Sequence, residues 1–427
     1  MPNRRTMLHT LAAAAGGALH GAAQARGATS AAPGAPSAAG KVDWNWLARQ
    51  YDLAPGTINL ENAYYGIMAR PVLEDFKRNI DYLNRHNSMH MRRDFDRQGG
   101  EAIREAVARH AGVDARTVEL TRGATESLQN LIANYRLLKA GDAVMYGNLD
   151  YGSMQSAMDD LAARHGATVS LVTIPEPATR QRVIDTYEEA LRRQPRTRLL
   201  LLTHVSHRTG LAIPVRDIVR MARQRNVDVI VDIAQSWGQL DFRIPDLEAD
   251  FVGANLHKWV GAPLGTGFLY IRPERLQDIG IQLGNRNYPS SDIRSRVASG
   301  TVDAAAFMTI PAALRFHAQV PLADRSARLR MLRDYWVHRL RDEPAIDILT
   351  PEEAGSYGAV TSLRLRGRTS FEANVELARR LADEHGIFTV ARDGPVGGSC
   401  IRVTPSYFTT TGQLDRLVAA VRTLARA

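Results

Sequence analysis

The sequence predicts an α/β fold, in which a mostly parallel β-sheet is wrapped by helices and a smaller α/β domain follows at the C-terminal end. Two observations predict it. Between residues 101 and 271, short apolar segments rich in β-branched residues alternate with segments of helical periodicity, as in parallel strands joined by crossover helices. A stretch rich in Gly, Asn, Pro and Ser near 285–305 interrupts this alternation, which predicts a second domain beyond it.

The predicted strands are short and apolar. Four consecutive leucines at 199–202 are typical of a strand buried on both faces of a sheet. The segment VDVIVDI at 227–233 is rich in β-branched residues, which favour strands. Strands are expected at 117–120, 143–146, 168–174, 198–203, 227–233, 251–255 and 267–271.

The predicted helices lie between these strands and continue beyond them. Apolar positions recur at helical spacing in EAIREAVARH at 101–110. The segment DWNWLARQY at 43–51 is expected to form an N-terminal helix that folds back on the small domain. Helices are further expected at 127–138, 154–165, 184–193, 215–224, 308–319 and 323–340.

The N-terminal residues read as an export leader. Arg4 and Arg5 precede a weakly apolar stretch rich in Ala and Gly, and Ala23-Gln24-Ala25 has the small residues of a cleavage site. Paired arginines before a weakly hydrophobic segment resemble a twin-arginine signal, which predicts a periplasmic protein. The predicted organisation is a signal at 1–25, a flexible linker at 26–41, an N-terminal segment packing on the small domain at 42–74, a large domain at 75–295 and a small domain at 296–427.

Composition argues against several classes of protein. The 427 residues are 44% hydrophobic and 23% charged, which is typical of a globular chain. Cys400 is the only cysteine, so no internal disulfide and no cysteine-ligated metal site is predicted. There is no strongly apolar run long enough to predict a membrane span. The net charge of +9 comes from arginines spread along the whole chain rather than gathered in one stripe, which argues against nucleic-acid binding.

Polar residues that could take part in catalysis or ligand binding follow the ends of predicted strands. Asp232 ends the strand at 227–233 and Gln235 follows it, while Lys258 comes directly after the strand at 251–255. Lysine is rare in this chain, since only four of the 54 basic residues are lysines. The turn at 121–126 (TRGATE) joins a strand to a helix through small residues, which suits a phosphate at a helix N-terminus. Ligands of open α/β sheets bind at this edge.

These groups suit pyridoxal phosphate. The amine of Lys258 can form a Schiff base with the aldehyde, the carboxylate of Asp232 can keep the pyridine nitrogen protonated, and the turn at 121–126 can anchor the phosphate. An acidic side chain directly after a buried apolar strand is costly without such a partner. The sequence therefore predicts one pyridoxal-phosphate site.

Across about residues 55–425 the sequence resembles the class V aminotransferase family of fold-type I pyridoxal-phosphate enzymes. The resemblance is strongest in THVSHRTGLAIPV, VDIAQSWGQLDF and ADFVGANLHKWVGAPLGTGFLYIRPE, within residues 203–274, and is closest to the branch that resembles isopenicillin N epimerase. Together with the predicted leader, it is also similar to periplasmic pyridoxal-phosphate enzymes that tailor siderophores such as pyoverdine. It implies a homodimer with the active site at the subunit interface.

The resemblance also implies roles for single residues in the cofactor site. Lys258 resembles the Schiff-base lysine that moves the α-proton, Asp232 the partner of the ring nitrogen, and Gln235 the donor to the phenolic oxygen. Tyr151 matches the residue stacked on the ring. The residues that match the phosphate cup are Ala124, Thr125, Asn255 and His257, with Thr301 reaching in from the neighbouring subunit.

For the substrate, Arg402 in CIRVTP matches the arginine that forks onto an α-carboxylate, and Arg392 is a second candidate. Two positions depart from the family. His207 stands where many relatives carry the Asn that contacts the phenolic oxygen, so it takes over this contact or adds an acid/base group. The loop cysteine of desulfurases is missing, and Cys400 is expected to be a buried, inert thiol, which disfavours cysteine desulfuration.

Several outcomes at the substrate's α-carbon remain open. An aminotransferase-type or siderophore-tailoring reaction on an amino acid or peptidyl amine is favoured, and an epimerase or C–S lyase of the same fold is the alternative. A non-catalytic periplasmic binding protein is the alternative from another class. Packing roles are expected for Trp44, Trp237 and Trp259.

Overall fold

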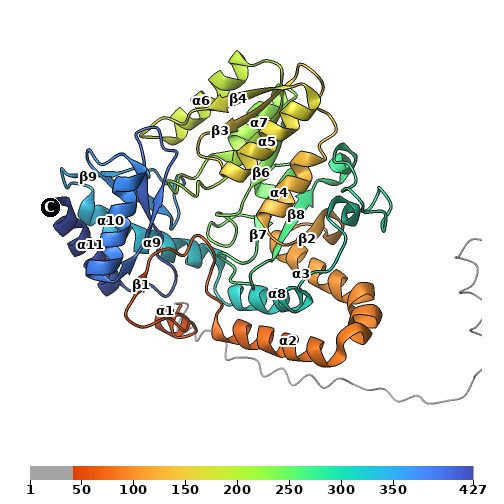
Figure 1. The fold of residues 1–427 in the computed structure, drawn as a ribbon, viewed down its shortest axis with the longest axis horizontal. Helices are drawn as coiled ribbons and strands as arrows, with labels where there is room; N and C mark the ends of the chain where they lie inside the picture. The colour runs from red at the N-terminus through yellow and green to blue at the C-terminus, as the bar shows by residue number, and fades with distance from the viewer. Residues whose placement is uncertain (1–41, 427) are drawn as a thin grey trace, which may run out of the picture. The chain divides into compact units, whose positions relative to one another are not determined.

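A seven-stranded sheet organises the larger part of the chain (Figure 1) in the order β2-β8-β7-β6-β5-β3-β4. The computed structural model describes residues 42–426, so the predicted signal and linker at 1–41 lie outside the described residues. In this sheet β8 alone runs in the direction opposite to the other six strands, which confirms the mostly parallel sheet. The strands are β2 (Val118–Thr121), β3 (Ala143–Gly147), β4 (Thr168–Val172), β5 (Thr197–Thr203), β6 (Asp228–Asp232), β7 (Phe251–Asn255) and β8 (Gly267–Ile271).

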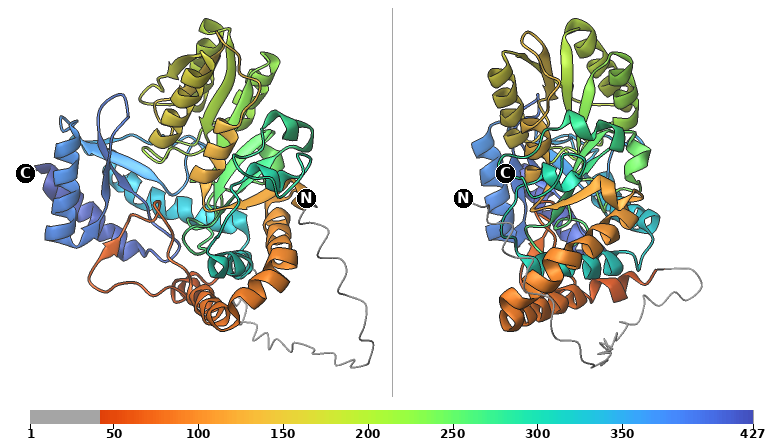
Figure 2. Two further views of the ribbon diagram at one scale, coloured as in Figure 1. Left: turned by 45° about the vertical axis from the view of Figure 1, so that its right-hand side comes forward. Right: turned by 90° about the vertical axis from the view of Figure 1, so that its right-hand side faces the viewer.

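Helices cover both faces of this sheet, as the two views of Figure 2 show. Successive side chains of a strand point to opposite faces, so Leu199 and Leu201 pack with α4 and α5 while Leu200 and Leu202 pack with α6 and α7. All four leucines are fully buried, which confirms the strand buried on both faces. The helices are α3 (Gly100–Ala111), α4 (Ala124–Ala133), α5 (Gly152–His165), α6 (Arg180–Arg193) and α7 (Val215–Gln224).

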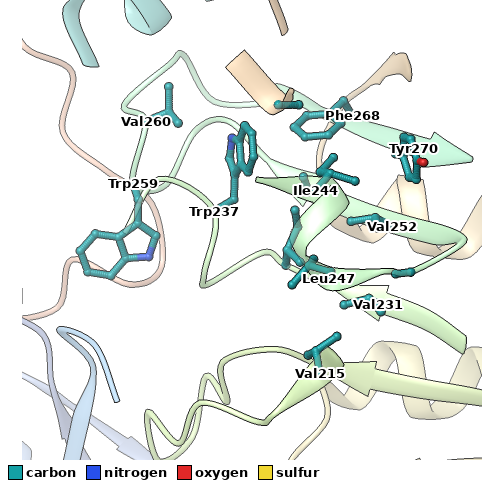
Figure 3. Packing of buried hydrophobic residues seen from close by; sticks show 14 of the residues in the cluster. Val215, Val231, Trp237, Ile244, Leu247, Val252, Trp259, Val260, Phe268 and Tyr270 are labelled. Atoms are coloured by element: carbon teal, nitrogen blue, oxygen red, sulfur yellow. The ribbon is translucent and has the colours of Figure 1, made fainter. Parts of the chain in front are cut away.

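The core beside β6, β7 and β8 is shown in Figure 3. Val231, Val252 and Phe268 come from the adjacent strands β6, β7 and β8 and share this core with Trp237. Both Trp237 and Trp259 are buried, which confirms their predicted packing roles. Trp44 is partly buried, and the guanidinium of Arg328 lies 5.4 Å from the centre of its ring.

A second, four-stranded antiparallel sheet lies toward the C-terminal end, in the order β12-β13-β10-β9. Its strands are β9 (Ile346–Ile348), β10 (Thr361–Leu365), β12 (Val390–Arg392) and β13 (Cys400–Val403), and its helices are α9 (Leu322–Leu340), α10 (Phe371–His385) and α11 (Thr411–Arg426). The N-terminal segment joins this part of the fold, because β1 (Ile58–Asn59) pairs in parallel with β11 (Ile387–Phe388). The short helix α1 (Trp44–Ala48) lies at the start of that segment.

Three features differ from the expected pattern. The helix expected at 127–138 ends at Ala133, and the hydroxyl of Tyr135, which is buried beyond it, donates to Asp228. The sequence analysis did not predict α2 (Arg70–His90), a helix with one buried residue that leads into a π-helical segment (Met91–Gly99). Helix α8 (Ala304–His317), which follows the predicted domain boundary, contacts α2 and α3 and shares the core of the large sheet. The boundary between the large and the small domain at 295/296 therefore stays a prediction. Among the described residues, no helix is long and apolar enough to cross a membrane.

Candidate functional site

A cavity of about 740 Å³ lies at the carboxyl ends of β5, β6 and β7, where residues of the large sheet face residues of β12 and β13. Every predicted site residue except Thr301 lines it: Ala124, Thr125, Tyr151, His207, Asp232, Gln235, Asn255, His257, Lys258, Arg392 and Arg402. Thr301 is exposed in the loop before α8. Its contact from a neighbouring subunit therefore stays a prediction.

Lys258 and Asp232 reach the same cavity because they follow adjacent parallel strands. Asp232 is buried at the end of β6, and its Oδ1 accepts a hydrogen bond from the amide of Ala234 at 2.7 Å. Burial raises the pKa of Asp232, and the charge of Lys258 opposes this effect. Burial also lowers the pKa of Lys258 to about 8, although Asp232 favours the ammonium form. An appreciable fraction of the amine is therefore neutral, and nucleophilic, near neutral pH.

The turn before α4 forms a cradle for an anion. Gly123 has φ +151°, and a Cβ there would lie 3.0 Å from Asn255 Oδ1 and 3.2 Å from His257 Cε1. The amide of Ala124 donates to Asn255 Oδ1 at 2.7 Å, so Asn255 holds the turn in place. Within the described part of the chain, the amide and hydroxyl of Thr125 have no hydrogen-bond partner. Thr125 therefore supplies the free donors at the positive end of the helix.

His257 lies beside this cradle as a neutral imidazole. Its Nδ1–H donates to the carbonyl of Thr266 at 2.9 Å, which leaves Nε2 as an acceptor. Burial lowers the pKa of His257 to about 4, an effect that Lys258 reinforces. An anion bound in the cradle would oppose this shift, and His257 would donate to it once Nε2 is protonated.

Gln235 and Asp150 connect the segments that surround the cavity. Gln235 donates to the carbonyl of Ala63 at 2.7 Å, which ties the N-terminal segment to the loop after β6. Asp150, which was not predicted from the sequence, is a buried carboxylate that accepts from the amides of Gly147 at 2.7 Å and Thr203 at 3.0 Å. These bonds join the ends of β3 and β5 and fix the backbone directly before the predicted stacking residue, Tyr151. Burial raises the pKa of Asp150 to about 6.

Tyr151 and His207 form an aromatic pair at the cavity wall. Their ring centres are 5.3 Å apart and the planes meet at 86°, an edge-to-face arrangement. Nδ1 of His207 is buried and has no hydrogen-bond partner among the described residues. Burial lowers the pKa of His207 well below its usual value, and the nearby charges of Arg208 and Arg402 add to this effect. His207 is therefore neutral at pH 7 and can donate or accept a hydrogen bond.

The two predicted substrate arginines lie on neighbouring strands, with Arg392 on β12 and Arg402 on β13. Between them lies Glu61, which the sequence analysis missed. The carboxylate of Glu61 accepts from Nε of Arg402 at 3.2 Å and from Nη2 of Arg392 at 3.3 Å, and it also pairs with Nη2 of Arg402. The available signal was an acidic residue directly after Leu60, in a segment where the apolar Ile58 and Leu60 flank Asn59, because a buried carboxylate there needs a partner.

These residues suit pyridoxal phosphate. A lysine of lowered pKa suits the aldehyde, a buried carboxylate suits a protonated ring nitrogen, and a helix N-terminus with free donors suits the phosphate. Nδ1 of His207, which is buried and has no partner in the part of the chain that the structure describes, is a further polar atom on the cavity wall that a bound group could satisfy. The donor set therefore agrees with the cofactor that the sequence predicts.

Comparison with known proteins identifies the family of this chain. The family model for Aminotransferase class-V matches residues 69–414. Isopenicillin N epimerase of Streptomyces clavuligerus is 27% identical over 400 residues, which cover 90% of this chain and 98% of that protein.

Solved structures show the same fold at lower identity. The cysteine desulfurase CsdA of Escherichia coli is 22% identical, with a TM-score of 0.77 over 90% of this chain and 99% of that chain. The cystine C–S lyase C-DES, in a structure with glycine covalently linked to its pyridoxal phosphate, is 22% identical, with a TM-score of 0.76 over 88% of this chain and 98% of that chain. Since the family match spans most of the sequence, the chain belongs to the class V aminotransferase family of pyridoxal-phosphate-dependent enzymes.

Proposed function

We propose that this enzyme transfers the amino group of an amino acid or peptidyl amine, or tailors a siderophore by related chemistry, through a proton transfer at the substrate's α-carbon. The single observation that carries the proposal is the placement of Lys258 and Asp232 in one cavity, where burial lowers the pKa of the lysine to about 8. A lysine with this pKa can accept and return a proton near neutral pH. An arginine on the opposite wall is suited to a carboxylate of the substrate.

Each wall of the cavity has a distinct part in this proposal. When bound, pyridoxal phosphate supplies an electron sink for the pair of electrons left at the α-carbon. Lys258 would hold the cofactor covalently and then move the proton, while Asp232 would keep the ring nitrogen protonated. Edge-to-face packing with His207 would hold Tyr151 at the cavity wall, where it would stack on a bound ring. The residues that would complete the cofactor site are Ala124, Thr125, Gln235, Asn255, His257 and, from a second subunit, Thr301.

The test begins with the absorbance spectrum of the purified protein before and after borohydride. We expect a yellow band that borohydride bleaches, with the cofactor mass on the peptide that contains Lys258. A screen of amino acids with an oxo-acid acceptor should then show transfer of the amino group, and Lys258→Ala should abolish both the band and the turnover. A protein that stays colourless after pyridoxal phosphate is added would contradict the proposal and favour the non-catalytic binding protein.

Epimerisation is the second candidate. It is favoured by two isopenicillin N epimerases that are each 27% identical and align with 90% of this chain. His207 is a second titratable group on the cavity wall besides Lys258, and return of the proton to the opposite face of the α-carbon would invert that carbon. Exchange of the α-hydrogen with solvent deuterium, together with loss of optical activity and no oxo-acid product, would identify this reaction.

Cleavage of a C–S bond is the other open chemistry. A release of pyruvate with sulfide or persulfide from cystine would identify a C–S lyase. Cys400 is buried as predicted, and burial raises the pKa of its thiol to about 11, so it is a poor nucleophile in this conformation. The expectation that cysteine desulfuration is disfavoured stays a prediction, since desulfurases are among the relatives of this chain.

A further inference from the structure

Glu61 occupies the guanidinium that the family resemblance assigns to the substrate. Its two oxygens accept from Nε and Nη2 of Arg402, which is the forked geometry that a substrate carboxylate would adopt. The third nitrogen of Arg402, Nη1, donates to the carbonyl of His207. Arg402 is almost completely buried, with 2% of its side chain exposed, and each of its nitrogens already has an acceptor.

A substrate could reach this fork only by displacing Glu61. The Glu61 side chain is 5% exposed, and its remaining cationic partner would be Arg392, at 3.3 Å. A buried carboxylate that loses its forked partner carries a large desolvation penalty. The Glu61–Arg402 pair is therefore a fixed part of the wall, which positions β13 against the N-terminal segment.

Arg392 is in a different state. It makes one long contact with Glu61, its Nη1 donates only to the adjacent carbonyl of Ala391, and its buried Nε has no partner among the described residues. Its side chain is 26% exposed and lines the cavity. Arg392, Arg402 and Glu61 together have a net charge of +1. The hydrogen-bond donors of this group that remain available to a ligand belong to Arg392.

We infer that Arg392, not Arg402, receives the carboxylate of the substrate, and that Glu61 reserves the site for one carboxylate by neutralising Arg402. This inference rests on the proposed function, because it assumes an amino-acid substrate at the same cavity. Arg392 is thus the specificity-determining residue, while Glu61 and Arg402 are positioning residues.

The experiment compares two reagents that react with the aldehyde carbon of pyridoxal phosphate. Aminooxyacetate has a carboxylate, and O-methylhydroxylamine has none. The ratio of their rate constants measures recognition of the carboxylate. We expect Arg392→Gln to lower this ratio about 10-fold or more, since hydrogen bonds to charged groups are strong. The double variant Glu61→Gln/Arg402→Gln removes both buried charges together, and its ratio should stay within about threefold of the wild type. Arg366→Gln, which removes an exposed arginine paired with Asp347, is the matched control.

A second readout does not depend on the cofactor. Phenylglyoxal should modify Arg392 well before Arg402 in the wild-type protein, and propionate should protect Arg392. The inference would be overturned if the ratio of the two rate constants fell in the double variant and not in Arg392→Gln. It would also be overturned if phenylglyoxal labelled Arg402 faster than Arg392. A wild-type protein that reacts with neither aldehyde reagent would instead contradict the proposed function, and the labelling would still decide between the two arginines.

Discussion

The backbone of Gly66 lies directly against that of Lys258. The amide of Gly66 donates to the carbonyl of His257 at 2.8 Å, and a Cβ on Gly66 would stand 2.0 Å from the carbonyl oxygen of Lys258. No side chain fits in that space, since real Cβ contacts do not approach so closely. The N-terminal segment therefore supports the lysine from behind, and it can do so only with glycine at this position.

Gly66→Ala should consequently damage both stability and the site. The methyl group must push apart two backbone segments, so we expect the free energy of unfolding to fall by about 2 kcal/mol or more. Displacement of Lys258 should also weaken the cofactor band. Denaturant unfolding and absorbance would measure both effects. Gly100→Ala is the control, because nothing lies within 4 Å of its Cβ and its φ of −64° is helical, so its stability should be unchanged or slightly higher.

The sequence predicted the sheet well because its strands carry their own signal. Runs such as the four leucines of β5 are apolar at every position, and the structure buries both of their faces. Helix α2 carried no comparable signal, since Val72 is its one buried residue among many charged ones. Its place in the fold is set by packing against α8, whose residues lie far along the chain.

The residues of the cavity that lie at the ends of strands could be predicted from the sequence. Asp232 and Lys258 come together because parallel strands β6 and β7 end at the same edge. Glu61 could not be placed in this way, because it lies 341 residues from Arg402 along the chain. The bond from Gln235 to the Ala63 carbonyl was equally hidden, since a side-chain bond to distant backbone leaves no pattern in the sequence.

Asp232→Asn should separate cofactor binding from turnover. An amide of the same shape can still accept from the Ala234 amide through its oxygen, so the fold and the covalently bound cofactor should persist. It cannot keep a pyridine nitrogen protonated, and we expect kcat to fall about 100-fold or more. Steady-state kinetics on protein of measured cofactor content would test this. Unchanged turnover would mean that Asp232 does not act on the ring.

A homodimer whose active sites use Thr301 of the neighbouring subunit is a further proposal. Thr301 is exposed on the single chain and outside the cavity, so a contact with the phosphate requires a second copy. We expect light scattering to give twice the mass of the chain, and Thr301→Ala to weaken pyridoxal-phosphate affinity several-fold. Thr301→Ser should restore most of the affinity because it keeps the hydroxyl. A monomer with full affinity would contradict both parts.

Export to the periplasm through the paired arginines is likewise proposed. Replacing Arg4 and Arg5 together with lysine keeps the positive charge and removes the motif, so we expect the protein to accumulate unprocessed in the cytoplasm. Cell fractionation and the mass of the N-terminal peptide would measure the effect. Arg26→Lys, beyond the predicted cleavage site, is the control. Normal export of the double variant would rule out a twin-arginine signal.

The lowered pKa of Lys258 predicts how cofactor attachment depends on pH. Only the neutral amine attacks an aldehyde, so the rate constant for attachment should rise with pH, pass its midpoint near 8 and level off above it. Asp232 favours the ammonium form, and Asp232→Asn should therefore move the midpoint to lower pH. Asp159→Asn, at an exposed residue bonded to Tyr146, should leave it unchanged. Stopped-flow absorbance on the cofactor-free protein would give these midpoints. A wild-type midpoint near 10.5, the ordinary value, would show that the cavity does not desolvate the amine, because burial is the largest cause of the shift.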